Sequence, residues 1–75
     1  MSTLRKRSIL LAGHATSVAL EPEFWAVLEE WAESEALSLA ALIARLDSER
    51  GRRPLASACR VAALERVARR AAPAR

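Results

Sequence analysis

Few side chains in this 75-residue sequence could carry out acid–base or metal chemistry. His14 and Cys59 are the only histidine and the only cysteine, and they lack the close spacing of metal-ligand motifs. No Ser/His/Asp set can be assembled from one histidine on a strand and an acidic cluster. We therefore expect no catalytic residue, no metal site and no cofactor. His14 is interpreted as structural, Cys59 as a small buried apolar residue, and the acidic cluster as a solvated helix face made of Glu29, Glu30, Glu33 and Glu35.

The charges are segregated along the chain, although the net charge is only +3. Residues 21–49 hold eight acidic residues and one arginine, whereas residues 50–75 hold eight arginines and one glutamate. Arg5, Lys6 and Arg7 precede every acidic residue. This asymmetry indicates a polyanionic partner for the basic ends. The alternative is that acidic and basic helices pair with each other, within the chain or in a dimer, and charge alone does not choose.

The length of the chain suits one small domain. Such a monomer buries only about 60% of its unfolded surface, and a single cysteine offers no disulfide, so oligomerisation is the remaining common route to stability. No apolar run approaches the roughly 20 residues that cross a bilayer. Residues 9–13 follow basic residues but are too short for a signal peptide. We predict a cytoplasmic protein that is not associated with a membrane.

A strand is predicted over residues 8–20, with Gly13 as a bend or bulge. Thr16, Val18 and Leu20 alternate with Ala15, Ser17 and Ala19, so the two sets lie on opposite faces. Residues 1–7 are interpreted as a basic N-terminal arm, residues 8–70 as the domain and residues 71–75 as a flexible tail.

Three helices should follow the strand. The first runs from Pro22 to Glu35, because proline suits the first turn and apolar residues then recur at helical spacing. Ser38 is a good N-cap for a second helix over residues 39–49, which Gly51 ends. A third helix spans residues 55–70. Trp25 is placed at the edge of the core, and the predicted dimer and core residues are Val18, Leu20, Phe24, Leu28, Trp31, Leu42, Ile43 and Leu46.

A lone strand before three helices leaves its backbone hydrogen bonds unpaired. Exposed strand edges are an aggregation hazard. A second copy of the same strand removes the hazard, because two antiparallel strands related by a two-fold axis form a closed pair. We therefore expect the strand to pair with its copy in a homodimer.

This plan, a shared strand followed by helix, turn and helix, resembles the ribbon-helix-helix family of DNA-binding proteins. The residues that carry the resemblance are GHATSVALEPEFW at 13–25, ALS at 36–38 and PLASA at 54–58. They are similar to a bacterial subgroup with a GHxTSxxLEPEFW-like motif and a third helix. The resemblance covers residues 6–65 and implies a mainly helical ribbon-helix-helix fold.

The resemblance also implies a function. Family members are dimers, mostly transcriptional repressors, with antitoxins among them, and they lay a two-stranded ribbon in the major groove of double-stranded DNA. In this chain the base-facing residues would be Ala15, Ser17 and Ala19. Phosphate contacts would come from Arg5, Lys6 and Arg7 beside the ribbon, and from Ser38 and Leu39 at the start of the second helix. A bacterial cytoplasmic protein, associated with the nucleoid when bound to DNA, is expected.

The sequence departs from the subgroup at three positions. Ala15 and Ala19 stand where the subgroup tends to have arginine and serine, and an alanine side chain offers only a methyl contact to thymine. Ala36 replaces a glycine that would best adopt the left-handed helix cap. Two functions therefore stay open, a DNA-binding dimer or a dimeric interaction module of the same fold whose arginine-rich third helix binds a protein partner.

Overall fold

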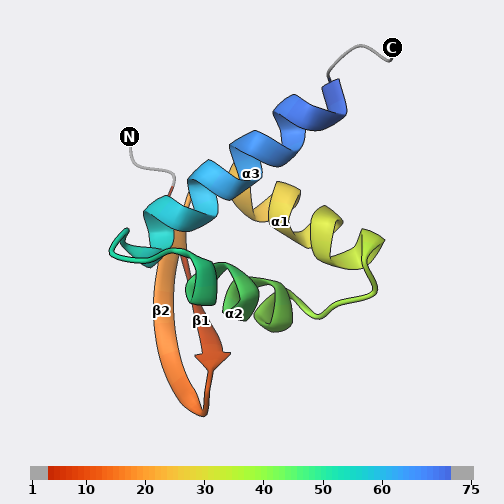
Figure 1. The fold of residues 1–75 in the computed structure, drawn as a ribbon. Helices are drawn as coiled ribbons and strands as arrows, with labels where there is room; N and C mark the ends of the chain where they lie inside the picture. Colours follow the sequence, from red (N-terminus) through yellow and green to blue (C-terminus); the bar gives the residue numbers. More distant parts are fainter. Residues whose placement is uncertain (1–3, 72–75) are drawn as a thin grey trace.

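The computed structural model describes residues 4–71, which form a hairpin of two strands followed by three helices (Figure 1). The elements are β1 (Arg5–Leu11), β2 (His14–Leu20), α1 (Pro22–Ser34), α2 (Leu39–Glu49) and α3 (Leu55–Ala71). The hairpin extends beyond the helices at its turn, and α3 runs away from the strands toward the C-terminus. This architecture has the helix order expected from the sequence, but it has two strands where one was expected.

Ala12 and Gly13 make the turn of the hairpin, because Leu11 pairs directly with His14. Both turn residues have positive φ, 51° and 83°, as a type I′ turn requires, and such turns match the twist of paired strands. Gly13 adopts this conformation without a steric penalty, whereas the Cβ of Ala12 makes the left-handed region unfavourable. The turn sets the antiparallel register, which continues to the pair Arg5–Leu20.

The expectation of a single strand over residues 8–20 is wrong. The chain reverses at Ala12 and Gly13, and residues 5–7, expected in the arm, begin β1. The hydrogen-bond partner of β2 is therefore a strand of the same chain. A glycine between two alternating stretches was a signal for this turn, but Ala12 stands where Asn, Asp or Gly is usual. Residues 1–3 of the expected arm and residues 72–75 of the tail lie outside the described residues.

The end of α1 is a Schellman motif. The N–H of Leu37 donates to the carbonyl of Ala32 at 2.8 Å, and the N–H of Ala36 donates to the carbonyl of Glu33 at 3.1 Å. Ala36 has φ 56°, so alanine occupies the left-handed position that glycine prefers. Leu37 packs against the core and thereby holds the chain in this reversal.

The second helix begins and ends at local signals. The Oγ of Ser38 accepts a hydrogen bond from the N–H of Ala41 at 3.0 Å, which satisfies one of the free donors of the first turn. Gly51 follows the helix with φ 61° and leads into the turn before α3. These signals give α2 the same bounds that the sequence predicts.

The core lies between one face of the hairpin and the three helices. Its largest fully buried side chains are Leu20, Leu28, Leu42, Ile43 and Cys59, and Val18, Trp31 and Leu46 are also buried. Trp25 is 4% exposed, whereas Phe24 is only half-buried. The tryptophan thus has the central position that the sequence analysis gave to the phenylalanine. Trp25 also ties α1 to β1, because its Nε1 donates to the carbonyl of Arg5 at 2.9 Å.

Ile9 and Leu11 are buried core residues that the sequence analysis did not include. They lie on β1, opposite Thr16 and His14 of β2. Side chains directly opposite each other share one face of a sheet, so the inner face of the hairpin takes its apolar groups from both strands.

Candidate functional site

The hairpin has an outer face that the helices leave uncovered. Successive residues alternate between the faces of a strand, and directly opposite residues share a face. Because Val18 and Leu20 are buried, their neighbours in β2 face outward, together with their partners in β1. The outer-face pairs are Lys6–Ala19, Ser8–Ser17 and Leu10–Ala15.

The three residues expected to face DNA bases therefore share one surface. Ala15 and Ser17 are exposed and Ala19 is half-buried. The structure adds Lys6, Ser8 and Leu10, which sequence reasoning missed on this face because it placed no second strand beside β2. No contact in the structure tests the role of these residues toward DNA, which stays a prediction.

The three basic residues expected to clamp phosphates lie on different faces. Lys6 is on the outer face, while Arg5 and Arg7 are on the inner face at the base of the hairpin. Arg7 is already engaged: its Nη1 lies 2.7 Å from Glu29 Oε2, and its guanidinium stacks 4.8 Å from the ring centroid of Trp25. The structure therefore does not assemble these residues into one basic clamp.

The predicted phosphate site at the start of α2 is intact as a helix N-terminus but stands apart from the hairpin. Ser38 caps the helix, and Leu39 is its first residue. Figure 1 shows that the α1–α2 connection lies on the side of the molecule away from the strands. One chain thus does not bring Ser38 and Leu39 to the outer face of its own hairpin.

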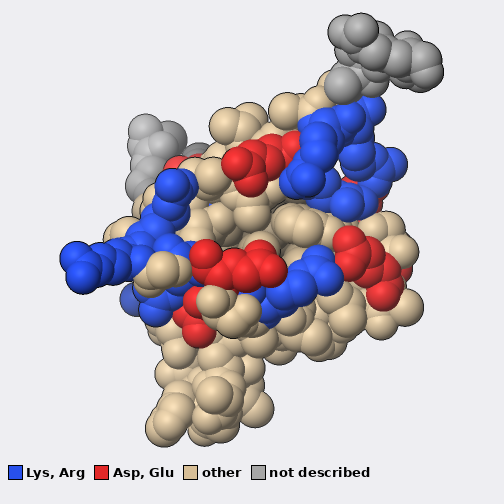
Figure 2. Space-filling view, viewed as in Figure 1, with Lys and Arg blue, Asp and Glu red and all other residues tan. Residues whose placement is uncertain are grey.

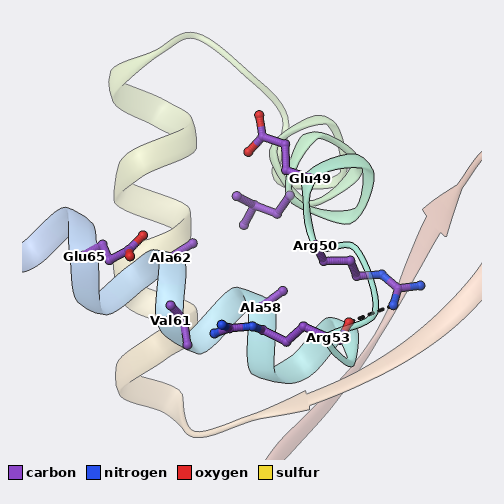
Figure 3. A pocket seen from close by; sticks show the side chains of 8 residues that line it. Glu49, Arg50, Arg53, Ala58, Val61, Ala62 and Glu65 are labelled. Atoms are coloured by element: carbon purple, nitrogen blue, oxygen red, sulfur yellow. Dashed lines mark hydrogen bonds between the residues drawn. The ribbon is translucent and has the colours of Figure 1, made fainter.

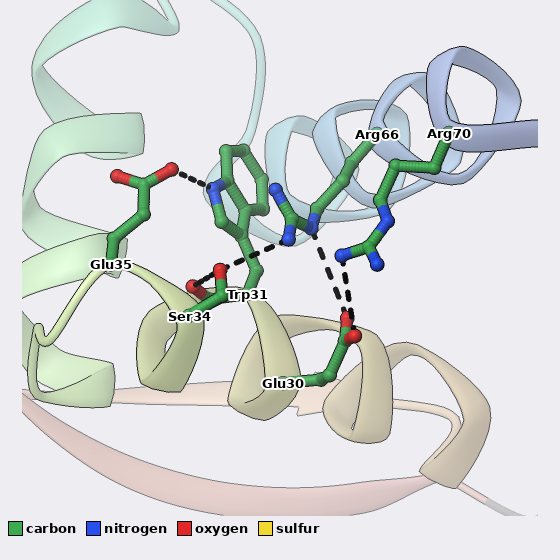
Figure 4. A network of polar contacts seen from close by, with 6 residues as sticks. All are labelled: Glu30, Trp31, Ser34, Glu35, Arg66 and Arg70. Carbon is green, nitrogen blue, oxygen red and sulfur yellow. Dashed lines mark hydrogen bonds and ion pairs between the residues drawn. The ribbon is translucent and has the colours of Figure 1, made fainter.

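Acidic and basic helices pair within the chain, as one of the two readings of the charge pattern proposed. Glu30 binds Arg66 and Arg70 of α3, and Arg66 also donates to Ser34 Oγ at 3.0 Å while stacking on Trp31 (Figure 4). At the start of α1, Glu21 accepts hydrogen bonds from Arg60 at 2.9 and 3.3 Å. Much of the positive charge of α3 is therefore neutralised by α1 and the residue before it.

Hydrogen bonds lower the pKa of two carboxyl groups, those of Glu35 and Glu21. The hydrogen bond from Trp31 Nε1, at 2.7 Å, is the main cause for Glu35, and Arg45 adds to it. For Glu21, the hydrogen bonds from Arg60 lower the pKa. Both carboxylates therefore stay ionised to a lower pH than free glutamate does, because their partners stabilise the charged form.

Other cations have no acidic partner within ion-pair distance in residues 4–71, namely Arg5, Lys6, Arg52, Arg53 and Arg69. Figure 2 shows basic side chains spread over the upper part of the face in view, while the protruding end of the hairpin carries no charge. Residues 8–20 indeed contain no Lys, Arg, Asp or Glu. The hairpin thus offers an uncharged tip with a basic residue, Lys6, at its base.

A shallow groove lies between the end of α2 and α3 (Figure 3). Its polar groups are the carboxylates of Glu49 and Glu65 and the guanidinium groups of Arg50 and Arg53. It contains no imidazole, hydroxyl or thiol group. Within residues 4–71, no cluster of three or more His, Cys, Asp or Glu side chains is arranged to hold a metal ion, and no helix is long and apolar enough to cross a membrane.

Cys59 is fully buried, and burial raises the pKa of its thiol to about 11. A thiol in this state is almost entirely protonated at neutral pH and is a poor nucleophile and metal ligand. Its contribution is to packing between α3 and the rest of the core.

The comparison with protein families identifies the family to which this chain belongs. The sequence model of the ribbon-helix-helix domain matches residues 4–67, from the residue before β1 to the last turns of α3. The chain belongs to the ribbon-helix-helix domain family. Comparisons with curated proteins and with solved structures gave no match.

Ribbon-helix-helix domains typically bind DNA in transcription regulators and are generally not enzymes. They usually bind DNA as dimers. The match covers the hairpin, α1, α2 and most of α3, so the outer face of the hairpin belongs to the matched domain. The more specific likeness to a bacterial subgroup stays a prediction.

Proposed function

We propose that this chain is a homodimeric DNA-binding transcription regulator, a repressor or antitoxin-like protein, that inserts the outer face of its strands into the major groove. The observation that carries the proposal is the uncovered outer face of the ribbon in a ribbon-helix-helix domain. A two-stranded β-ribbon has the width that the major groove of B-DNA accepts. The helices cover the opposite face and leave this one free.

The polar groups of the outer face set the expected specificity. Ser8 and Ser17 stand directly opposite each other and can donate to or accept from base edges, and Lys6 can reach a phosphate or a guanine. Ala15 and Leu10 offer only apolar contacts. A good bidentate base contact contributes about 1–3 kcal/mol of discrimination, and a single hydroxyl contributes less, so binding should be modestly specific and strongly dependent on salt.

The test compares duplexes selected from a random pool with unselected duplexes, by fluorescence anisotropy at fixed salt. Ser17→Ala should reduce the preference for selected duplexes and leave affinity for random DNA nearly unchanged. Ala15→Arg should introduce a preference for guanine at the matching base, because arginine binds the guanine edge through two hydrogen bonds. Unchanged selectivity in Ser17→Ala would exclude the hairpin as the reading element.

The proposed dimer uses the free edge of β2. In a hairpin with a two-residue turn, Leu11 and His14 form a hydrogen-bonded pair, and every second pair along the ladder does the same. The N–H and C=O groups of Ala15, Ser17 and Ala19 therefore point away from β1. They have no backbone partner among the described residues. Antiparallel pairing of β2 with its copy would satisfy them and bring two outer faces together.

Two proline variants separate this edge from the hairpin itself. Ser17→Pro removes an N–H that points to the free edge, so the chain should fold but lose the β2 contact between copies. Val18→Pro removes an N–H that bonds β1 and should unfold the domain. Circular dichroism and sedimentation velocity measure both effects. A Ser17→Pro variant that associates as the wild type does would contradict pairing through β2.

One observation favours the second function, an interaction module with lost base readout. Leu10 is 64% exposed at the turn end of the outer face, and a large apolar side chain there suits a protein surface as well as a thymine methyl group. This function predicts equal, weak binding to all duplexes in the anisotropy experiment, and a protein partner that also engages α3.

A further inference from the structure

The third helix has an uncharged face on the side opposite Ala58, Cys59 and Ala63, which it buries in the core. Ser57, Val61, Leu64, Ala68 and Ala71 follow one another at intervals of four, three, four and three residues. This spacing gives the straight apolar seam by which two helices pack together. Leu64 is 65% exposed and the adjacent Val67 is 47% exposed, and they are the only large hydrophobic residues of the described helices with such exposure.

Charged side chains are excluded from this seam although α3 is rich in arginine. Arg60 lies at its border, but Glu21 holds its guanidinium. Arg66 and Arg70 turn toward α1, where they bind Glu30 (Figure 4). The contacts inside the chain thus draw arginine side chains away and leave the seam apolar.

The seam is complementary to itself. In an antiparallel pair of α3 helices with a two-fold axis near residue 66, Leu64 faces Ala68 of the second copy and Val61 faces Ala71. A large side chain then meets a small one in each layer, which is the condition for close packing. Because the axis is two-fold, every such contact occurs twice.

The charges beside the seam match the same register. Glu65 and Arg69 are exposed, and neither has an ion-pair partner among residues 4–71. In the antiparallel pair, Glu65 of each copy lies two residues from the position opposite Arg69 of the other, so the two long side chains can reach each other. Opposite charges therefore meet on both sides of the axis, whereas a pair centred on Glu65 would bring like charges together.

We propose that the uncharged face of α3 is a contact surface for a second copy of this chain, formed by antiparallel packing of two α3 helices. This contact is separate from the edge of β2. If both contacts form, two β2-paired dimers associate through α3, and if only α3 associates, the protein is a dimer.

Sedimentation velocity of the full chain tests the surface. Leu64→Glu should lower the weight-average mass by about half, whichever state the wild type adopts, because a carboxylate in the seam stays hydrated. Leu10→Glu is the matched control, since Leu10 is 64% exposed and Leu64 is 65% exposed. The control should keep the wild-type mass. Circular dichroism must show that both variants keep the helical content of the wild type.

Charge exchange tests the register. Glu65→Arg and Arg69→Glu should each weaken association, because each brings like charges together across the pair. The double variant with both substitutions should restore association, and raised salt should reduce the differences among the variants.

Two results would overturn the proposal: a Leu64→Glu variant with the mass of the wild type, or a double variant no better associated than the single ones. Neither result bears on the DNA-binding function, which is measured with Ser17→Ala. Loss of mass in Ser17→Pro but not in Leu64→Glu would assign all association to β2.

Discussion

At the scale of single residues, two alanines occupy backbone positions that favour glycine. Ala12 and Ala36 have φ of 51° and 56°. The conformational preference of alanine itself does not favour these angles. The strand pairing on both sides of the turn holds Ala12 in place, and the packing of half-buried Leu37 against the core after the Schellman motif holds Ala36. The surrounding structure therefore imposes an unfavourable conformation on both residues.

We expect Ala36→Gly to raise the free energy of unfolding by about 0.5–1 kcal/mol, because glycine relieves the left-handed strain although it adds entropy to the unfolded chain. Urea denaturation followed by circular dichroism measures the change. Ala26→Gly is the control, since Ala26 is exposed inside α1 and should lower stability by about 1 kcal/mol. A loss of stability in Ala36→Gly would argue against the left-handed cap.

Cys59 should be unreactive in the folded protein. The thiol is fully buried and has a pKa of about 11. Little thiolate therefore exists at neutral pH, and a thiol reagent in solution cannot reach the sulfur. A thiol-specific chromogenic reagent should label less than one tenth of Cys59 in native protein in the time that labels all of it in urea. Rapid labelling without denaturant would show that α3 opens from the core.

At the scale of elements, ion pairs and tryptophan contacts hold α1, α2 and α3 together. The guanidinium carbons of Arg45 of α2 and Arg66 of α3 lie 5.8 and 5.2 Å from the ring centroid of Trp31 of α1. Glu35 accepts from both Trp31 and Arg45. This arrangement concentrates electrostatic coupling between helices at the end of α1.

The contacts of Glu35 predict that the stability of the protein depends on pH. The pKa of Glu35 is below the ordinary 4.5 in the folded state, so its contribution to stability is complete above pH 4.5 and is lost as pH falls through the lowered value. Glu35→Gln should therefore be less stable than the wild type at pH 7, and the difference should shrink below pH 4.5. Thermal melts across pH measure it, with Glu33→Gln as control because Glu33 is exposed and has no ion pair in residues 4–71. A difference independent of pH would contradict the assignment.

At the scale of the whole molecule, internal pairing decides which basic residues remain for DNA. Arg60, Arg66 and Arg70 are bound to acids of the same chain. Lys6, Arg52 and Arg53 have no acidic partner in the described residues. The net charge of +3 therefore does not show which cations are bound by acids of the same chain and which remain available for DNA.

Lys6 and Arg7 should differ in their effect on DNA binding. If Lys6 contacts a phosphate, Lys6→Ala should reduce the slope of log affinity against log salt by about one ion for each site, on all sequences alike. Arg7→Ala should change the slope less, because Arg7 is held by Glu29 and Trp25, and should lower stability instead. Anisotropy titrations at several salt concentrations measure both slopes. Equal slopes in the two variants would mean that Arg7 leaves its internal partners on DNA.

The sequence by itself determined the helices of this protein and the alternation of β2. Ser38 caps α2 and Gly51 follows its end, and Pro22 begins α1; these signals act through neighbouring backbone groups, so they can be read locally. The family likeness also followed from residues in the chain, and the family match over residues 4–67 confirms it.

Only the tertiary structure decided the partner of β2, the composition of the outer face and the pairing of the charges. Strand pairing joins backbones that the sequence pattern does not relate, and Ala12 gives no strong turn signal, so the hairpin with Lys6, Ser8 and Leu10 on its outer face was not predicted. Trp25 rather than Phe24 fills the core because β1 packs on that flank of α1. Arg60 and Glu21 are 39 residues apart in sequence, and only the folded chain brings such charges within reach of each other.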